Sequence, residues 1–374
     1  MAGSLAETLA LFDPTLPLER AHTIPSAWYL DPTIYTAECR TVFVNTWQAA
    51  GRLDQLAEPG SFLTTDIAGE PIAVVRDQEG ILRAFSNVCR HRAARVLEEA
   101  CGKVSRLRCR YHGWTYDLAG RLRGTPEFEG VADFHREEQG LVRLAVDTWG
   151  PLVWVRQTPP GHTPPALAEF LASLPERTRG LGLETLRFVE RREYVVACNW
   201  KVFVDNFLDG GYHVNSVHPT LAGVLDYAHY HTEIADHTSV QSSPLRPPDP
   251  NSAAAAAAKV RTGEMAYYWW VFPNFMLNIY RGTMDTNLVL PLGPDQCRVI
   301  FDFYFADTEG PEAKARIAES IAVAHQIQLE DAGICEEVQR GLASRSFHTG
   351  RFSVRRELAG YHFHRLLARY LQSG

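Results

Sequence analysis

Long hydrophobic runs are missing from this sequence of 374 residues. No stretch approaches the roughly 18–20 consecutive apolar residues of a membrane-spanning helix, so we expect no membrane partner. Positive charge is not in excess either, and a formal net charge of −7 argues against nucleic acid as a main partner. The first residues lack the basic region of a secretory signal and the Arg-rich character of a transit peptide, which predicts a cytoplasmic protein.

Cysteines are few, and their pattern does not indicate a disulfide framework. There are seven, an odd number at irregular spacing. A reducing cytoplasm therefore fits best. The sequence also lacks internal repeats and a G-x-G-x-x-G motif, so we expect no nicotinamide or flavin site on this chain. Five of the cysteines are expected to be buried thiols, namely Cys39, Cys101, Cys198, Cys297 and Cys335.

Two short segments each carry one cysteine and one histidine. They are Cys89-Arg90-His91 and Cys109-Arg110-Tyr111-His112, with seventeen residues between them. Two thiolates and two imidazoles suit a tetrahedral zinc ion or a [2Fe–2S] cluster in which two histidines bind one iron. Zinc sites usually space their pairs as C-x2-4-C or H-x3-5-H, so the mixed pairs favour the cluster. The sequence therefore predicts a redox protein.

A second pair of histidines, His213 and His218, precedes Pro219. On one helix, five residues rotate by ~500°, which leaves the two side chains ~140° apart. Convergence on one ion therefore needs a break between them. Pro219 disfavours the helical conformation of His218, so the pair can straddle a helix end. The alternative is that both are ordinary polar residues near a helix terminus.

Both regions resemble those of one family. Cys109 to Gly120 is similar to the second ligand loop of Rieske proteins, and Asn87 to Ala93 to the first. The segment Asn199 to His213, followed by His218, resembles the catalytic iron motif of Rieske non-heme iron oxygenases. In this family we expect Cys89, His91, Cys109 and His112 to hold the cluster.

The resemblance also implies that a carboxylate on a helix far downstream is the third iron ligand, and Asp331 occupies the corresponding position. Two histidines and one carboxylate form a facial triad that leaves positions of Fe(II) open for O2 and substrate. Glu330 is the rival ligand, but it lies ~100° away around the same helix. The remaining alternative is that both acids only form a solvated face.

The resemblance covers nearly the whole chain and implies an α+β fold. It predicts an N-terminal arm at residues 1–44 that packs on the catalytic domain, and an all-β Rieske [2Fe–2S] domain at 45–156. The catalytic mononuclear iron domain at 157–374 has an antiparallel sheet wrapped around helices, of the helix-grip type. The resemblance further implies a homotrimer in which cluster and iron of different chains cooperate, and a separate reductase or ferredoxin.

One departure concerns the acid that connects a cluster histidine of one subunit with an iron histidine of the next. Many members place it three residues before the first iron histidine, where this chain has Gly210. We expect Asp209 to reach that place, because the Gly210-Gly211 pair permits unusual backbone angles. Asp205 is the alternative, or Asp209 only caps a turn. Asn206, in the same motif, is expected to assist catalysis.

Three segments look most like choline monooxygenase and related quaternary-ammonium oxygenases: Leu208–His213, Phe272–Asn278 and Met284–Leu292. This predicts hydroxylation or N-dealkylation of a small substrate by O2 and externally supplied electrons. The aromatic run Tyr267–Phe272 offers rings for cation–π contacts, although alternate residues of a strand face opposite sides. The alternatives are an aromatic-ring hydroxylating or O-demethylating oxygenase, or an electron carrier only.

Local patterns predict the following elements. Strands are expected at 61–67, 71–76, 81–85, 141–146, 152–155, 184–197, 267–280, 287–292 and 298–306, and helices at 34–43, 199–208, 311–342 and 356–371. The Pro-rich stretch 157–165 is expected to be a linker, and the alanine run 253–258 a surface loop or helical turn. Ten basic residues near the cluster would either steer an acidic electron-transfer partner or pair locally: Arg83, Arg90, Arg92, Arg95, Lys103, Arg106, Arg108, Arg110, Arg121 and Arg123.

Overall fold

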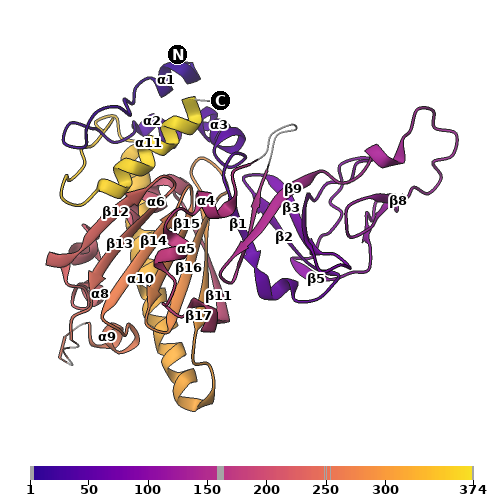
Figure 1. Cartoon of the computed structure of the whole chain (residues 1–374). Helices are drawn as coiled ribbons and strands as arrows, with labels where there is room; N and C mark the ends of the chain where they lie inside the picture. The colour runs from indigo at the N-terminus through magenta and orange to yellow at the C-terminus, as the bar shows by residue number, and fades with distance from the viewer. Residues whose placement is uncertain (1–3, 158–163, 248, 250, 253, 373–374) are drawn as a thin grey trace. The chain divides into compact units, whose positions relative to one another are not determined.

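The chain folds into two units, each built on its own large antiparallel sheet (Figure 1). The computed structural model describes residues 4–157, 164–247, 249, 251–252 and 254–372. One unit comprises Met1–Val42 together with Phe170–Gly374, and the other comprises Phe43–Glu169. Most of the expected linker at 157–165 lies outside the described residues, as does Ala253.

The unit from Phe43 to Glu169 is mainly β-structure. Its larger sheet has the strand order β1-β10-β9-β4-β3-β2-β5, and a smaller sheet has the order β6-β7-β8. The β2–β3 hairpin turns at Ala68-Gly69, and both residues have the positive φ (49° and 87°) that two-residue hairpin turns need. The strands are β1 Gln48–Arg52, β2 Ser61–Ile67, β3 Glu70–Arg76, β4 Leu82–Ser86, β5 Cys101–Lys103, β6 Leu107–Arg108, β7 Thr115–Tyr116, β8 Leu122–Gly124, β9 Arg143–Trp149 and β10 Leu152–Arg156.

The three strands expected between residues 61 and 85 are present as β2, β3 and β4, and 152–155 is present as β10. The strand expected at 141–146 begins at Arg143. The sequence did not predict β5 to β8, because strands of two or three residues are too short for an alternating pattern to appear. It did not predict β1 either, whose five residues QAAGR include no β-branched or aromatic side chain. Two 3-10 turns, η1 Leu53–Leu56 and η2 Arg136–Glu138, complete this unit.

The larger unit contains a seven-stranded sheet with the order β11-β17-β16-β15-β14-β13-β12, all antiparallel. The expected strand at 267–280 is in fact two strands, because Pro273 stands in the turn between them and cannot donate a ladder hydrogen bond. The sequence did not predict β12 or β13. The strands are β11 Arg187–Val196, β12 His231–Ala235, β13 Thr238–Pro244, β14 Met265–Val271, β15 Phe275–Tyr280, β16 Thr283–Pro291 and β17 Cys297–Phe305.

Helices complete this unit, and together with the two antiparallel sheets they confirm the α+β fold. The 33-residue α10 packs against β11, α6, α7 and α9. The helical turn expected as one alternative for the alanine run is present as α9, but it is not a surface element, because it buries Ala257 and Val260. The elements are α4 Leu167–Phe170, α5 Leu174–Arg177, η3 Leu183–Thr185, α6 Trp200–Phe207, α7 Val214–Val217, α8 Pro219–Ala222, η4 Tyr227–His229, α9 Ala255–Val260, α10 Gly310–Leu342 and α11 Leu358–Gln372. No helix among the described residues is long and apolar enough to cross a membrane.

The N-terminal arm belongs to this larger unit. Its helices α1 Leu5–Leu9, α2 Ser26–Leu30 and α3 Pro32–Thr41 lie beside the C-terminal helix α11 (Figure 1). Asp31 caps α3 by accepting a hydrogen bond from the Thr33 amide, and Pro32 occupies the first helical position. The arm thus reaches α6 and α11.

A buried ion pair joins the arm to α6. Lys201 Nζ lies 2.5 Å from Glu38 Oε1, and both side chains are fully buried. Trp200 Nε1 donates to the other oxygen of Glu38 at 2.8 Å. Because α6 leads directly into the segment with the two histidines, this pair fixes the start of that segment relative to the arm.

We predict that Lys201→Met destabilises the larger unit, because it leaves the Glu38 carboxylate buried without its counter-charge. The expected loss is about 3–5 kcal/mol in the free energy of unfolding. The double variant Lys201→Met/Glu38→Leu is expected to recover part of it, and Lys259→Met, which changes an exposed lysine, to cost little. Urea unfolding followed by tryptophan fluorescence measures all three. Equal losses in the single and double variants would contradict the prediction.

Candidate metal centres

The two Cys/His loops repeat one backbone pattern. The Cys89 amide donates to the carbonyl five residues later, and the Ala93 amide donates back to the Cys89 carbonyl (2.8 and 3.0 Å). The loop after Cys109 makes both bonds at the same spacing, with the same distances. Ala93 and Gly113 occupy matching positions, and both have positive φ (59° and 73°). Two equivalent turns therefore present one thiol and one imidazole each.

The four side chains differ in exposure in the way that a histidine-ligated cluster requires. Cys89 and Cys109 are buried, His91 is half-buried and His112 is exposed. The two imidazole rings lie 4.5 Å apart between centroids. The buried Nδ1 of His91 has no hydrogen-bond partner among the described residues, as expected of a nitrogen reserved for a metal. Two inner thiols and two outer imidazoles fit a cluster with two cysteines on one iron and two histidines on the other.

Burial also sets the protonation of these groups. Burial, with the neighbouring His112, lowers the pKa of His91, which favours the neutral imidazole that can bind a metal. Burial raises the pKa of the Cys109 thiol, and its neighbour Cys89 adds to this effect. A thiolate pair in this place therefore needs a positive partner, which iron supplies.

Two aromatic residues of the second loop support the first. Trp114 stacks on His91, with centroids 4.9 Å apart and planes 7° apart. The Tyr116 hydroxyl accepts a hydrogen bond from the Arg90 amide and lies 3.4 Å from Cys89 Sγ. Burial raises the pKa of Tyr116, so its hydroxyl keeps a proton that it can donate to sulfur. Both residues lie within the Cys109–Gly120 motif, but their roles depend on contacts with the first loop that the sequence alone does not reveal.

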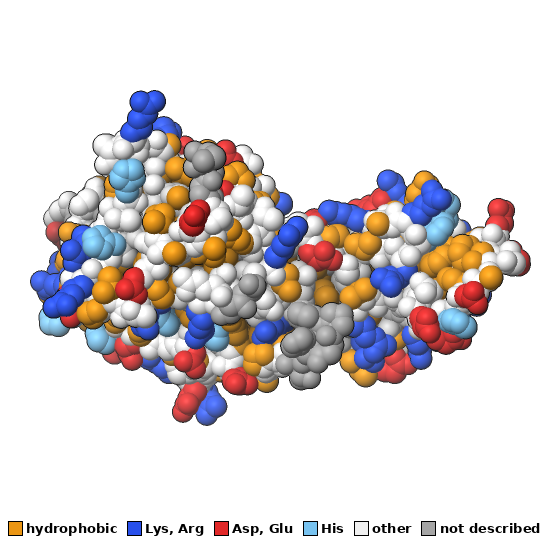
Figure 2. All heavy atoms as spheres, turned by 90° about the horizontal axis from the view of Figure 1, so that it is seen from above, with side chains coloured by type: hydrophobic (Ala, Val, Ile, Leu, Met, Phe, Trp, Pro, Cys, Tyr) orange, Lys and Arg blue, Asp and Glu red, His pale blue; other side chains and the backbone are white. Residues whose placement is uncertain are grey.

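The basic residues around this centre divide into two sets. Six form ion pairs within the unit, as Arg83 does with the buried Asp77; the others are Arg95, Lys103, Arg110, Arg121 and Arg123. Red and blue side chains accordingly alternate over this unit, on the right of Figure 2. Four exposed arginines make no ion pair within the described part of the chain: Arg90, Arg92, Arg106 and Arg108. Local pairing thus accounts for six of the ten.

In the larger unit, the helix break expected between the two histidines is present. His213 directly precedes α7 without a side-chain capping hydrogen bond, and His218 stands between α7 and α8, with Pro219 as the first residue of α8. Before them, Gly210 and Gly211 have φ of 70° and 71°. A Cβ on Gly210 would lie 2.1 Å from a backbone oxygen of Arg356, so this turn accepts only glycine.

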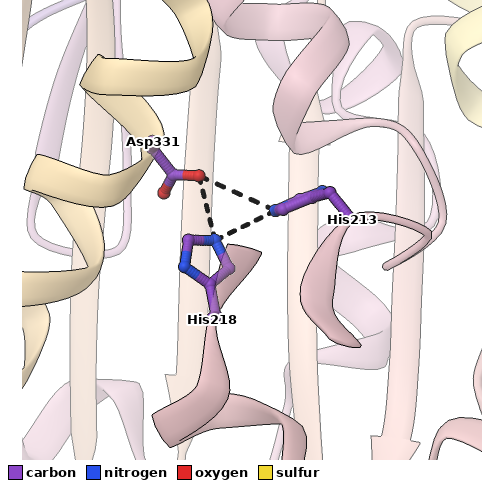
Figure 3. Close-up of side chains that lie close together, drawn as sticks. All are labelled: His213, His218 and Asp331. Carbon is purple, nitrogen blue, oxygen red and sulfur yellow. Dashed lines mark hydrogen bonds and ion pairs between the residues drawn. The ribbon is translucent and has the colours of Figure 1, made fainter. Parts of the chain in front are cut away.

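His213, His218 and Asp331 point toward one another (Figure 3). The Nε2 atoms of the two histidines are 3.1 Å apart, and Asp331 Oδ1 on α10 lies 3.0 Å from His218 Nε2 and 3.7 Å from His213 Nε2. Two ligands about 2.1 Å from a metal ion and at right angles to each other are about 3.0 Å apart. Two of the three separations match this value and the third is wider, so the three atoms approximate one face of an octahedron, the arrangement of a two-histidine, one-carboxylate triad.

Carboxylates hold the other nitrogen of each histidine. His213 Nδ1 lies 2.6 Å from Asp209 Oδ2, and His218 Nδ1 lies 2.7 Å from Glu330 Oε2. With Nδ1–H donated to a carboxylate, Nε2 keeps its lone pair for a metal. Burial lowers the pKa of His218, but Asp331 and Glu330 outweigh it and raise this pKa above its ordinary value.

Asn206 and Asp205, at the end of α6, serve different partners. Asn206 donates to Asp331 Oδ1 at 2.7 Å and so fixes the carboxylate. Asp205 instead accepts from the Tyr29 hydroxyl at 2.6 Å and lies 2.8 Å from His364 Nε2. Because the Ile24 amide donates to His364 Nδ1, the proton of that ring is on Nε2. Of the two acids considered for the bridging role, only Asp209 contacts His213.

A cavity begins at the triad and runs between α10 and the sheet. Of the aromatic run on β14, only Tyr268 lines it, in agreement with the alternation of a strand. Its lining combines the triad with aromatic, amide and charged groups from β13 to β17, α6, α9 and α10, among them Phe203, Tyr230, Gln241, Arg261, Tyr268, Asn278, Tyr280, Asp285, Asn287 and Phe301.

Comparisons with known proteins agree with both centres. Residues 46–135 match the Rieske [2Fe-2S] domain, and residues 183–373 match the ring hydroxylating alpha subunit (catalytic domain). The chain is 40% identical over 373 residues to choline monooxygenase, chloroplastic, of Arabidopsis thaliana, covering 98% of this chain and 86% of that protein. It is 35% identical to the glycine betaine monooxygenase oxygenase subunit of Chromohalobacter salexigens, over 54% of this chain and 45% of that protein.

Among solved structures, the quaternary ammonium Rieske monooxygenase CntA is similar along the whole length. The TM-score is 0.83 at 25% identity, with 96% of this chain and 99% of that chain covered. The chain belongs to the Rieske non-heme iron oxygenases. It is therefore an oxidoreductase with a Rieske [2Fe–2S] cluster and a mononuclear iron.

Asp331 and Glu330 are expected to respond differently to substitution. Asp331→Ala removes a candidate ligand atom, so we expect it to abolish binding of the mononuclear iron. Glu330→Gln only weakens the hold on His218, which costs about 10–100-fold in metal affinity. Iron titration of chelator-treated protein measures both, with the visible spectrum of the cluster as an internal reference. The exposed Glu337→Gln on the same helix is the matched control. Unchanged iron binding in Asp331→Ala would refute the triad.

Proposed function

We propose that this oxygenase hydroxylates or N-dealkylates a small quaternary ammonium compound. The proposal rests on the cavity, because three tyrosines line it together with the triad: Tyr230, Tyr268 and Tyr280. The rings of Tyr230 and Tyr268 are nearly parallel, and those of Tyr268 and Tyr280 nearly perpendicular. Such rings attract a quaternary ammonium ion through cation–π contacts. The relatives described above are named for choline, glycine betaine and quaternary ammonium substrates, in support of this class.

Each part of the site has a proposed role. Cys89, His91, Cys109 and His112 hold the cluster, and His213, His218 and Asp331 hold Fe(II). When bound, the cluster supplies single electrons from a separate reductase or ferredoxin, and the iron supplies a site for O2 activation. Asp209 and Glu330 keep a proton on each Nδ1, and Asn206 orients Asp331. The aromatic wall positions the substrate and excludes water from the reacting C–H bond.

The electron path is proposed to run between chains of a homotrimer, with Asp209 as the bridging acid. Asp205, Asp209 and Glu357 line a hollow on the larger unit, whose other lining residues include the exposed Ile334 and Val338. On the Rieske unit, His112 is exposed, and so are the four arginines described above, which lie close to the two ligand loops in the sequence. The acidic hollow of one copy of the chain and the exposed arginines of another therefore have opposite charge and are complementary. Inter-subunit electron transfer is described for CntA.

Complementation between defective chains tests this arrangement. Cys109→Ser removes the cluster, His213→Ala removes the iron, and each homotrimer should be inactive. In every mixed trimer, about one of the three interfaces places a working cluster beside a working iron, so we expect the mixed species to show about one third of the wild-type activity. Two affinity tags isolate the mixed species. Mixed trimers that contain both centres and remain inactive would contradict transfer between chains.

The substrate class is tested by substrate-stimulated O2 uptake with a surrogate reductase. We expect choline or betaines to give kcat/KM values at least about tenfold above those of aromatic acids, because the quaternary ammonium group gains cation–π attraction from the tyrosine faces and an aromatic acid does not. Stimulation of O2 uptake by an aromatic acid alone would contradict the quaternary-ammonium assignment. It would favour the second candidate, an aromatic-ring hydroxylating or O-demethylating oxygenase, in which the same rings stack on a planar substrate.

We also propose a cytoplasmic location. Apart from Cys89 and Cys109, which are proposed to hold the cluster, the five cysteines are free thiols in the structure, and a reducing compartment keeps them so. The plant relatives bear the description chloroplastic, so members of this group also work in an organelle.

A further inference from the structure

The cavity contains one pair of opposite charges that the metal centre does not use. Apart from the triad, the only charged residues among its described lining residues are Arg261 and Asp285. Arg261 follows the last turn of α9, and Asp285 lies on β16. Charged side chains inside a protein are normally paired. These two form no ion pair with each other or with another described residue.

Asp285 belongs to a polar row across the sheet. Gln241, Tyr268, Asn278 and Asp285 are register partners on four successive strands, and all line the cavity. Asp285 Oδ2 accepts from Asn278 at 2.7 Å and from Asn287 at 3.2 Å. Oδ1 has no partner among the described residues. The side chain lies deep in the unit but remains accessible from the cavity, so one carboxylate oxygen is available to a ligand.

Arg261 is held from one side only. Its Nε donates to the Tyr280 hydroxyl at 2.9 Å, and that hydroxyl lies 2.9 Å from the hydroxyl of Tyr268. The guanidinium is 5.4 Å from the centroid of the Tyr280 ring. Nη1 is buried and has no partner within the described part of the chain. A buried N–H without an acceptor is costly, and a ligand that brings an acceptor removes this cost.

We propose that Arg261 and Asp285 select the charge pattern of the substrate. Asp285 and the tyrosine rings hold the quaternary ammonium, and Arg261 holds an acidic group of the same ligand, such as a carboxylate. A cavity wall with one cation and one anion is neutral, so it suits a zwitterion. A simple cation such as choline finds the same carboxylate but meets the repulsion of the guanidinium. This inference rests on the proposed quaternary-ammonium function and deepens it.

The test uses the holoenzyme with a surrogate reductase and four probes. Glycine betaine and γ-butyrobetaine are zwitterions, choline is a simple cation, and 3,3-dimethylbutan-1-ol is the neutral isostere of choline. For the wild type we expect kcat/KM to be at least about tenfold higher for a zwitterion than for choline, because the guanidinium pairs with a carboxylate. The neutral isostere should be the poorest substrate.

Variants separate the two charges. Arg261→Gln should raise KM about 10–100-fold for the zwitterions, because a charge-assisted hydrogen bond is lost, and should leave KM for choline the same or lower. Arg261→Lys keeps the charge and should retain the preference for zwitterions. Asp285→Asn should raise KM for all three ammonium probes and leave the neutral isostere unchanged. Arg281→Gln and Asp295→Asn, which change two separate exposed residues, are the matched controls, and we expect no change in KM for either variant.

Iron content and the cluster spectrum establish that each variant is folded. The inference is overturned if the wild type turns over choline as well as or better than both zwitterions, although the quaternary-ammonium function then stands. It is also overturned if Arg261→Gln raises KM for all four probes by the same factor, which is the result of a packing role. If none of the ammonium probes stimulates O2 uptake, the proposed function itself fails.

Discussion

The hydrogen bond between a carboxylate and Nδ1 of each histidine is the constraint on which the mononuclear centre depends. Without Asp209 and Glu330, either ring of the histidine pair could place its proton on Nε2 and present no lone pair to a metal. With them, both Nε2 atoms turn toward Asp331. The supporting acids come from different places, since Asp209 precedes α7 and Glu330 lies on α10. The site therefore forms only when α10 is packed against α6 and α7.

Helix α10 supplies two adjacent acids with different tasks. Neighbouring residues on a helix point ~100° apart, so Asp331 reaches the centre of the triad while Glu330 reaches the outer nitrogen of His218. Asn206, from the end of α6, completes the support by holding Asp331. The rotation of α10 about its axis thus determines both that Asp331 faces the two histidines and that Glu330 contacts His218 Nδ1. The buried pair of Glu38 and Lys201 holds α6 in the position that this geometry needs.

Sequence reasoning reached the metal chemistry but not the contacts that orient it. The two Cys/His pairs and the break before Pro219 follow from residues that are close in the chain. The choice of Asp331 over Glu330 follows from the family resemblance, because 113 residues separate Asp331 from His218. The partner of Glu330 could not be predicted, since 112 residues separate it from His218. The same holds for the register that aligns Asp285 with Asn278 and Tyr268. Strand β13 was missed because polar residues such as Thr238, Ser239 and Gln241 are buried on it, and β12 was missed because it has no buried apolar residue to mark a strand.

The position of Asp209, one residue earlier than in many relatives, is explained by the turn that follows it. Its Oδ1 accepts from the Tyr212 amide, and its Oδ2 accepts from both the amide and the imidazole of His213. The carboxylate thus caps the turn and supports the histidine at once, so the two roles considered for it are compatible. A left-handed conformation at both Gly210 and Gly211 folds the chain back over Asp209. The turn at Gly210 and Gly211 therefore accommodates the extra residue, and Asp209 still contacts His213.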